Sequence, residues 1–336
     1  WNTAMCLATQ RQNLEAQMAL SRPLNTIGGS DIAAIMGISE PTWSQAIDVY
    51  RRIVDGYQSY EDNEYMAMGR DAEPFIRSVY WRRLLTVPGT RVVSVNFGEQ
   101  QRRKKPKWAS GTPDDLLLVD DELRGVEYKL VTNPTRGAWG EEGTDQFPAQ
   151  YICQCAYYTW LFGVPHWDLA AYLPYRGVVV FRYVRNSEFE EEIIRRVTDF
   201  WENHVEKKIP PPANGSPSYT EYLSGQIEPS DEIAHATLEV NQMAAKYFDI
   251  EAKLDLLSEE KERIKQELVK FSDGKVLTGD SWLLRTKKSS RKSTKWKEVT
   301  DQLSQFVRPE VYEECVEAHT KVGESLIVTL KQTEAS

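Results

Sequence analysis

Three residues in the segment 108–130, WASGTPDDLLLVDDELRGVEYKL, have the side-chain types that cleave phosphodiesters with the help of a metal: Asp114, Glu127 and Lys129. Hard ions such as Mg²⁺ and Mn²⁺ take oxygen ligands from carboxylates, phosphates and water. A bound ion makes water more acidic, and a lysine beside it can orient or deprotonate that water. We therefore predict Asp114 and Glu127 as metal ligands, the backbone carbonyl of Leu130 as a further ligand, and Lys129 beside the water.

A β-hairpin would bring these residues to one edge of a sheet. Two short apolar strands, 116–119 and 126–130, flank an acidic turn that contains Gly125. Glu127 and Lys129 are two residues apart in the second strand, so their side chains point to the same face. Alternating charge on a solvated hairpin would give the same letters. The motif on its own therefore leaves both interpretations open.

The rest of the first 209 residues alternates helical patterns with short runs typical of strands. These runs are 91–97, 116–119, 125–130, 168–173 and 177–184. Such a mixture predicts an α/β fold.

Four prolines in eight residues, PPPANGSP at 210–217, forbid a helix and indicate a surface linker. We therefore predict three parts: a first domain at 1–209, a linker at 210–230 and a carboxy-terminal module at 231–336.

The carboxy-terminal module begins with apolar residues spaced alternately four and three apart, which predicts one long helix over 231–271. The seam is Ala236, Val240, Met243, Tyr247, Ile250, Leu254, Leu257, Lys261, Ile264, Leu268 and Phe271. Its mixed composition favours packing back on the same chain over a homomeric coiled coil. Ser272-Asp273-Gly274 ends the helix, and 275–288 resembles a basic β-hairpin.

The net charge of −9, from 41 Lys and Arg against 50 Asp and Glu, argues against a DNA-packaging protein. Positive charge is local, at 102–107 and 287–297. An enzyme needs carboxylates for metals and only a basic groove for nucleic acid.

The four scattered cysteines favour reduced thiols. No apolar run suggests a membrane segment or signal peptide, so we expect a cytoplasmic location.

Three further motifs give the sequence a family resemblance. They are IGGSDIAAIMG at 27–37, GRDAEP at 69–74 and QCAYY at 154–158. In order and spacing they resemble the YqaJ-type viral recombinase nucleases, relatives of phage lambda exonuclease within the PD-(D/E)XK superfamily. The long helix and basic hairpin are also similar to extensions on phage members.

The resemblance implies a restriction-endonuclease-like core with a central mixed sheet flanked by helices. It adds Glu73 to the metal ligands, implies Mg²⁺ or Mn²⁺ with two ions per site, and gives Gln154 and Tyr158 supporting positions. It also implies 5′→3′ digestion of linear double-stranded DNA from its ends, in the bacterial host cytoplasm if the protein is phage-encoded. A single-strand annealing recombinase as partner and a ring-shaped oligomer, often a trimer, follow from the same resemblance.

Members of this family also hold the terminal 5′-phosphate in a small pocket. By position its candidates here are Arg22, Ser30, Thr112 and Arg136, although Ser30 is equally suited to cap a helix at 31–36. The family often has Pro-Asp-Gly where this chain has Pro113-Asp114-Asp115. Either aspartate could therefore face the metal, and its proline neighbour favours Asp114.

Three functions fit these observations. The first is an exonuclease for phage or mobile-element recombination, and the second is an endonuclease of restriction or repair type with the same core. The third is a catalytically silent DNA-binding protein. The complete set of Glu73, Asp114, Glu127 and Lys129 argues against the third, because a silent copy would be free to lose one of them.

Overall fold

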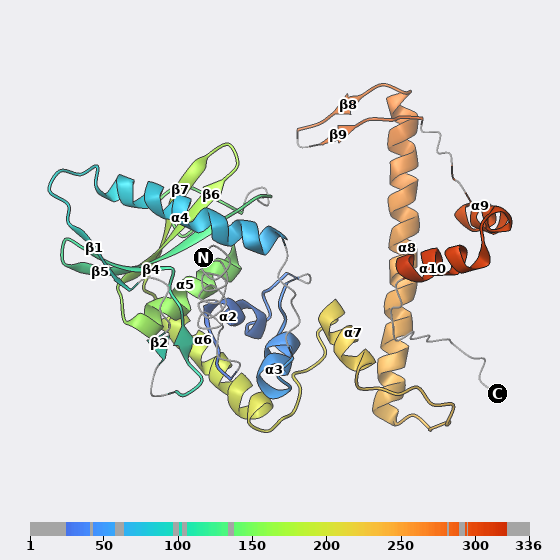
Figure 1. The fold of residues 1–336 in the computed structure, drawn as a ribbon, viewed down its shortest axis with the longest axis horizontal. Helices are drawn as coiled ribbons and strands as arrows, with labels where there is room; N and C mark the ends of the chain where they lie inside the picture. The colour runs from blue at the N-terminus through green and yellow to red at the C-terminus, as the bar shows by residue number, and fades with distance from the viewer. Residues whose placement is uncertain are drawn as a thin grey trace. The chain divides into compact units, whose positions relative to one another are not determined.

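The computed structural model describes residues 25–40, 43–57, 64–96, 101–102, 106–133, 138–280, 282–288, 293 and 295–320 (Figure 1). The chain divides into two compact units, residues 1–226 and 227–336. This division falls within the segment 210–230 that the sequence predicts as a linker. Unit 1 holds every residue predicted to do chemistry.

Unit 1 is built on a five-stranded mixed sheet with the strand order β1-β4-β5-β6-β7 (Figure 1). The strands are β1 (Val92–Asn96), β4 (Asp115–Val119), β5 (Glu122–Leu130), β6 (His166–Leu173) and β7 (Gly177–Val184). Only β5 and β6 pair in parallel; the other neighbours are antiparallel. This sheet, with its flanking helices, confirms the α/β prediction. A further short ladder joins β2 (Gln101–Arg102) to β3 (Ser110–Gly111).

The β4–β5 hairpin forms as the sequence predicts. Val119 pairs with Glu122, so the connection is the two residues Asp120 and Asp121. Both have positive φ, 49° and 72°, which two-residue hairpin turns require and which aspartate tolerates better than most residues. The tight turn fixes the register of the two strands and therefore the positions of the residues that flank them.

Helix α4 (Glu64–Leu84) covers one face of the sheet. Its buried Ile76 and Tyr80 pack against Leu117, Val126 and Tyr128. The opposite face is covered by α2 (Gly29–Ile35), α5 (Ala149–Phe162) and α6 (Ser187–Phe200), with α3 (Ala46–Val54) packed beside α2. Helix α5 lies on the crossover that a parallel β5–β6 pair needs. The sheet thus forms the middle of three layers.

The proline-rich segment folds onto unit 1. Asn214 donates from Nδ2 to Oε1 of Gln45 at 3.0 Å, and the Tyr219 hydroxyl donates to the carbonyl of Pro211 at 3.0 Å. This segment connects the π-helical turn η1 (Trp201–Val205) to α7 (Pro217–Ser224). It therefore holds specific contacts before the chain leaves unit 1.

Unit 2 contains one long helix, α8 (Leu238–Ser272), and a short hairpin of β8 (Leu277–Thr278) and β9 (Leu283–Leu284). The hairpin is followed by α9 (Trp296–Leu303), the 3₁₀ turn η2 (Ser304–Phe306) and α10 (Pro309–His319). The sequence predicts the helix and the hairpin, but α8 begins at residue 238 rather than 231. The hydroxyl of Thr237 accepts from the amide of Val240 and caps its first turn.

The end of α8 also follows the prediction. Asp273 adopts φ 47° and terminates the helix in the left-handed conformation. Among the described residues of both units, no helix is long and apolar enough to cross a membrane.

Candidate active site

Asp114, Glu127 and Lys129 lie close together, on strand β5 and at the residue preceding β4. Lys129 Nζ donates to Oε1 of Glu127 at 2.6 Å, as expected for side chains on one face of a strand. Asp114 lies directly before β4, and its Oδ2 accepts from the amide of Tyr128 at 2.7 Å. Tyr128 itself points to the opposite face and is buried against α4. The hairpin therefore gathers two carboxylates and one ammonium group.

The structure separates the two neighbouring aspartates. Asp115 is fully buried, and its carboxylate accepts from Arg77 Nε at 2.6 Å, Ser94 Oγ at 2.7 Å and the Tyr128 hydroxyl at 3.1 Å. A carboxylate with this many donors is already satisfied and serves the packing between α4 and the sheet. Asp114 is the aspartate that interacts with Glu127 and Lys129.

Glu73 comes from α4 and extends the group. Burial raises the pKa of Glu73; Lys129 lowers this pKa and Glu127 raises it. These mutual effects show that the Glu73 carboxylate lies within electrostatic range of both β5 residues. The four predicted residues, Glu73, Asp114, Glu127 and Lys129, therefore belong to one cluster.

The cluster holds more negative than positive charge. Burial raises the pKa of Asp114 well above its usual range, and the nearby charges of Glu127 and Glu73 raise it further. Burial alone would lower the pKa of Lys129, but Glu127 and Asp114 raise it above its ordinary value. Lys129 is thus an ammonium that offsets only part of the carboxylate charge. Added positive charge would favour the ionised forms of these three carboxyl groups, as Lys129 and Arg70 already do for Glu73.

Helix α5 fixes the orientation of Glu127. Gln154 Nε2 donates to Oε1 of Glu127 at 2.6 Å, and one turn later the Tyr158 hydroxyl donates to the carbonyl of Thr112 at 3.3 Å. Both predicted supporting residues therefore contact the hairpin segments that carry the carboxylates. A side chain at Gly29 would place Cβ 2.6 Å from Cζ of Tyr158 and 2.9 Å from Cγ of Gln154. Glycine at 29 lets α2 approach this face of α5.

The donor set suits a hard divalent cation. Oε2 of Glu127 is buried and has no hydrogen-bond partner among the described residues, an uncommon state for a buried carboxylate oxygen. In the described part of the chain, no three carboxylate, imidazole or thiol groups already stand close enough together to hold an ion. Oε2 of Glu127 is the oxygen available to a cation, while Oε1 accepts from Lys129 and Gln154.

Two of the four 5′-phosphate candidates, Ser30 and Thr112, lie among the described residues. Arg22 and Arg136 lie outside the described residues. Ser30 is exposed in the first turn of α2, and the alternative that it caps this helix is wrong, because Gly28 is the N-cap residue. The carboxylate of Asp31 accepts from the amide of Gly28 at 2.9 Å and so already satisfies this end. Thr112 lies beside Tyr158.

Tyr151 is a site residue that sequence reasoning missed. Burial raises its pKa, while Lys129 lowers it and Glu127 raises it. Its ring contacts Trp43 and Trp139, with ring centroids 6.2 and 5.8 Å away. The signal was present, because Tyr151 lies three residues before Gln154 and therefore on the same face of α5.

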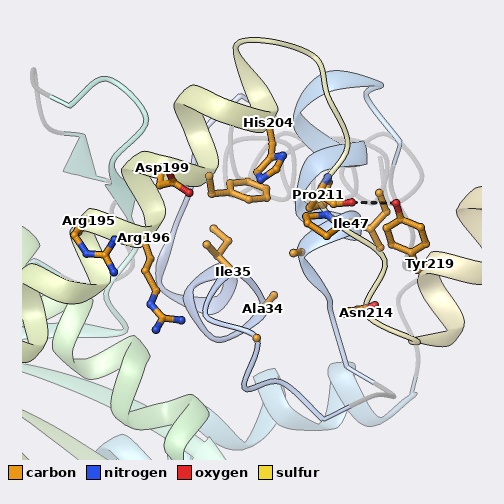
Figure 2. A pocket seen from close by; sticks show the side chains of 14 residues that line it. Ala34, Ile35, Ile47, Arg195, Arg196, Asp199, His204, Pro211, Asn214 and Tyr219 are labelled. Carbon is orange, nitrogen blue, oxygen red and sulfur yellow. Dashed lines mark hydrogen bonds between the residues drawn. The ribbon is translucent and has the colours of Figure 1, made fainter. Parts of the chain in front are cut away.

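A separate cavity of about 390 Å³ lies at the other end of α2 (Figure 2). Ile35 from α2, Arg196 and Asp199 from α6, and His204 from η1 are among its lining residues. It contains none of the predicted site residues. Glu192 forms ion pairs with Arg195 and Arg196 at 2.7 Å, so these guanidinium groups are already partly neutralised. We assign this cavity no part in the chemistry.

Residues 19–164 match the family model described as the YqaJ-like viral recombinase domain. Within this segment the chain is similar to that family. The match confirms the resemblance drawn from the motifs between residues 27 and 158. It includes all four residues of the cluster and ends just after α5. The matched segment thus ends two residues before β6 begins at His166. A comparison with curated proteins gives no match.

Solved structures with similarity to the chain include exonucleases from two bacteria. An alkaline exonuclease from Laribacter hongkongensis is 19% identical, with 60% of this chain and 95% of that chain covered and a TM-score of 0.40. Its complex with dAMP is 18% identical, with 60% and 93% covered and a TM-score of 0.41. A phage-related exonuclease from Haemophilus somnus is 16% identical, with 55% and 96% covered and a TM-score of 0.39.

Proposed function

We propose that this protein is a metal-dependent deoxyribonuclease with a PD-(D/E)XK core that digests linear double-stranded DNA from an end. The observation that carries the proposal is the environment of Glu127. One carboxylate oxygen is held by Lys129 and Gln154 at 2.6 Å each, and the other is buried without a partner beside Asp114 and Glu73. A structural ion pair would satisfy both oxygens, whereas a site that takes a cation keeps one available.

Asp114, Glu127 and Glu73 would hold the divalent cation. The proposed ion is Mg²⁺ or Mn²⁺, with two ions per site. The carbonyl of Leu130, the last residue of β5, is a further proposed ligand. Such an ion supplies positive charge that offsets the scissile phosphate and makes water easier to deprotonate. Gln154 orients Glu127, and Tyr158 holds the loop before Asp114 through Thr112.

Lys129 orients the attacking water in this proposal. Glu127 and Asp114 keep its side chain protonated in the arrangement described, so it donates hydrogen bonds rather than accepting protons. A cation held at Oε2 of Glu127 would supply positive charge beside Lys129 and lower the pKa of its ammonium, which is the condition for the alternative role of Lys129 as the base.

The finer function follows the family resemblance: 5′→3′ digestion that exposes single strand for annealing in phage or mobile-element recombination, with an annealing recombinase as partner. A 5′-phosphate pocket near Ser30 and Thr112, with Arg22 and Arg136, belongs to the same proposal. So does a ring-shaped trimer. Each of these needs its own experiment, because the cluster around Glu127 would serve any metal-dependent nuclease.

The test is digestion of linear duplex DNA labelled separately at its 5′ and 3′ ends, with closed circular DNA beside it, in Mg²⁺, in Mn²⁺ and in EDTA. We expect loss of linear DNA from its 5′ ends, survival of circles, and no digestion in EDTA or by Lys129→Ala. Cleavage of circles would instead favour the endonuclease. Binding of DNA without any metal-dependent cleavage would favour the silent binding protein.

A further inference from the structure

The apolar seam of α8 is exposed along its whole length. Its side chains range from 37% exposed at Leu268 to 80% exposed at Phe271. Ser272 is the single buried residue among those described in unit 2. A helix of 35 residues with a continuous exposed apolar stripe needs a partner, because contiguous apolar surface of this kind marks an interaction site.

The period of the seam indicates what the partner is. Seam residues recur every seven residues at two positions, from Val240 to Leu268 and from Met243 to Phe271, and all are apolar except Lys261. A straight α-helix drifts by about 20° for each seven-residue repeat, so a stripe that keeps this period is suited to contact with another supercoiled helix. The period therefore favours a helical partner, whereas the mixed composition of the seam favours packing on the same chain.

We propose that α8 pairs with α8 of a second copy of this chain in an antiparallel, two-fold symmetric coiled coil centred between Leu254 and Leu257. Antiparallel pairing about this centre places Val240 opposite Phe271 of the second copy, so a small residue meets a large one. It also places Leu254 opposite Leu257 of the second copy. A parallel pair in register would instead stack Phe271 on its own equivalent.

Lys261, the one charged residue in the seam, supports the same orientation. In the antiparallel dimer it lies opposite Ile250 of the second copy, where its aliphatic stem can pack and its ammonium can reach the edge. In a parallel dimer two Lys261 side chains would face each other within the core. Like charges at that position oppose the parallel arrangement.

The charges beside the seam are complementary in the antiparallel direction. Along one flank the first half of α8 carries Lys246 and Lys253, and the second half carries Glu260 and Glu267. Reversing one helix brings the lysines of one copy against the glutamates of the other. A parallel pair would leave Lys253 and Glu267 opposite serines but would bring Lys246 against Glu251 and Glu260 against Lys265, so the seam residues and not the flanking charges favour the antiparallel orientation.

The other flank of the seam is neutral in this arrangement. Antiparallel pairing places Glu251 opposite Ser258 and Lys265 opposite Ala244 of the second copy. Within the chain Lys265 contacts Glu262 at 3.1 Å on an exposed surface, and such an ion pair contributes little in water.

Two adjacent leucines give a matched test of the seam. Leu257 lies in the seam and is 61% exposed, and Leu256 lies outside it and is 66% exposed. The mass of the full chain in solution is measured by light scattering for the wild type, Leu257→Glu and Leu256→Glu. We expect Leu257→Glu to lose a two-fold association that Leu256→Glu keeps. A monomeric wild type, with the seam covered by another part of its own chain, or equal behaviour of both variants would overturn the proposal.

Cysteine crosslinking tests the orientation independently. Cys6 and Cys315 are first replaced by Ser, which leaves the buried Cys153 and Cys155. Val240→Cys and Phe271→Cys lie about 47 Å apart along α8 at 1.5 Å per residue. Each protein alone should stay uncrosslinked on oxidation, and a mixture of the two should give a disulfide-linked dimer. Crosslinking of Val240→Cys with itself would show parallel pairing and overturn the proposal.

A charge exchange adds a third readout. Lys253→Glu sets like charges against Glu260 of the second copy at two symmetric places, and we expect the dimer dissociation constant to rise by about ten-fold. Adding Glu260→Lys to the same chain should restore it. Failure of the double variant to recover would contradict the antiparallel register.

Discussion

Gln154 of α5 donates to Oε1 of Glu127 at 2.6 Å, and this bond leaves Oε2 of the same carboxylate buried and without a partner among the described residues. The helix therefore holds the carboxylate in place from one side while its second oxygen stays available. Lys129 donates to the same Oε1 at 2.6 Å, so this oxygen accepts from both donors. This arrangement directs the proposed metal to Oε2.

Replacing Gln154 by Ala should weaken metal binding more than it weakens the fold. Loss of the donor frees Glu127 to rotate, and partners that orient a metal ligand typically contribute 10–100-fold in affinity or activity. Mn²⁺ binding followed by calorimetry, together with digestion of linear DNA over a range of Mn²⁺ concentrations, would measure the loss. Excess Mn²⁺ should restore part of the activity. Unchanged metal affinity in the variant would show that Gln154 does not orient the proposed metal ligand Glu127.

Asp114→Asn and Asp115→Asn should give opposite phenotypes. Asp114→Asn removes a proposed metal ligand and should lower digestion by more than about 100-fold, beyond the loss typical of outer partners, while the protein stays folded. Asp115→Asn removes the negative partner of Arg77 from a fully buried position and should lower the free energy of unfolding by about 3–5 kcal/mol. Digestion assays and chemical denaturation of both proteins would separate the roles. If Asp115→Asn were the inactive but stable variant, the assignment of the two aspartates would be reversed.

The raised pKa of Asp114 predicts how stability depends on pH without metal. A carboxyl group whose pKa is higher in the folded than in the unfolded protein stabilises the fold below its unfolded pKa of about 3.9, and this contribution is lost as pH rises through the folded value. In EDTA, the wild type should therefore lose stability relative to Asp114→Asn as pH rises from acid toward neutral. Thermal unfolding of both proteins across that range is the measurement. A constant difference between the two curves would contradict the raised pKa.

The sequence predicted the elements whose signals are local. Strand β7 has the predicted bounds 177–184, and the β4–β5 hairpin follows from two apolar runs and an acidic turn. The same-face placement of Glu127 and Lys129 needs only the two-residue period of a strand. These parts of the fold and of the site follow from neighbours along the chain.

The remaining features depend on contacts between distant segments. The sequence around Asp115 does not predict that its partner is Arg77, which lies 38 residues earlier. Similarly, α8 begins at a threonine cap and not at the start of the predicted helical stretch, because a capped end is more stable than an uncapped extension. The choice between Asp114 and Asp115 therefore required the packing of α4 on the sheet.

Gly29→Ala should couple a small packing change in α2 to the chemistry on β5. The new methyl group would lie 2.6 Å from the Tyr158 ring and 2.9 Å from Gln154, so these two side chains of α5 must shift to accept it. Overpacking of this kind costs about 1–3 kcal/mol, and the shift would pull Gln154 from Glu127 and lower activity.

Gly69→Ala is the matched control, because a methyl group there meets nothing within 4 Å and α4 gains helix propensity of about 0.5–1 kcal/mol. Denaturation curves and digestion rates of both variants test this coupling. A Gly29→Ala protein that loses stability yet digests DNA at the wild-type rate would show that α2 does not position the α5 face.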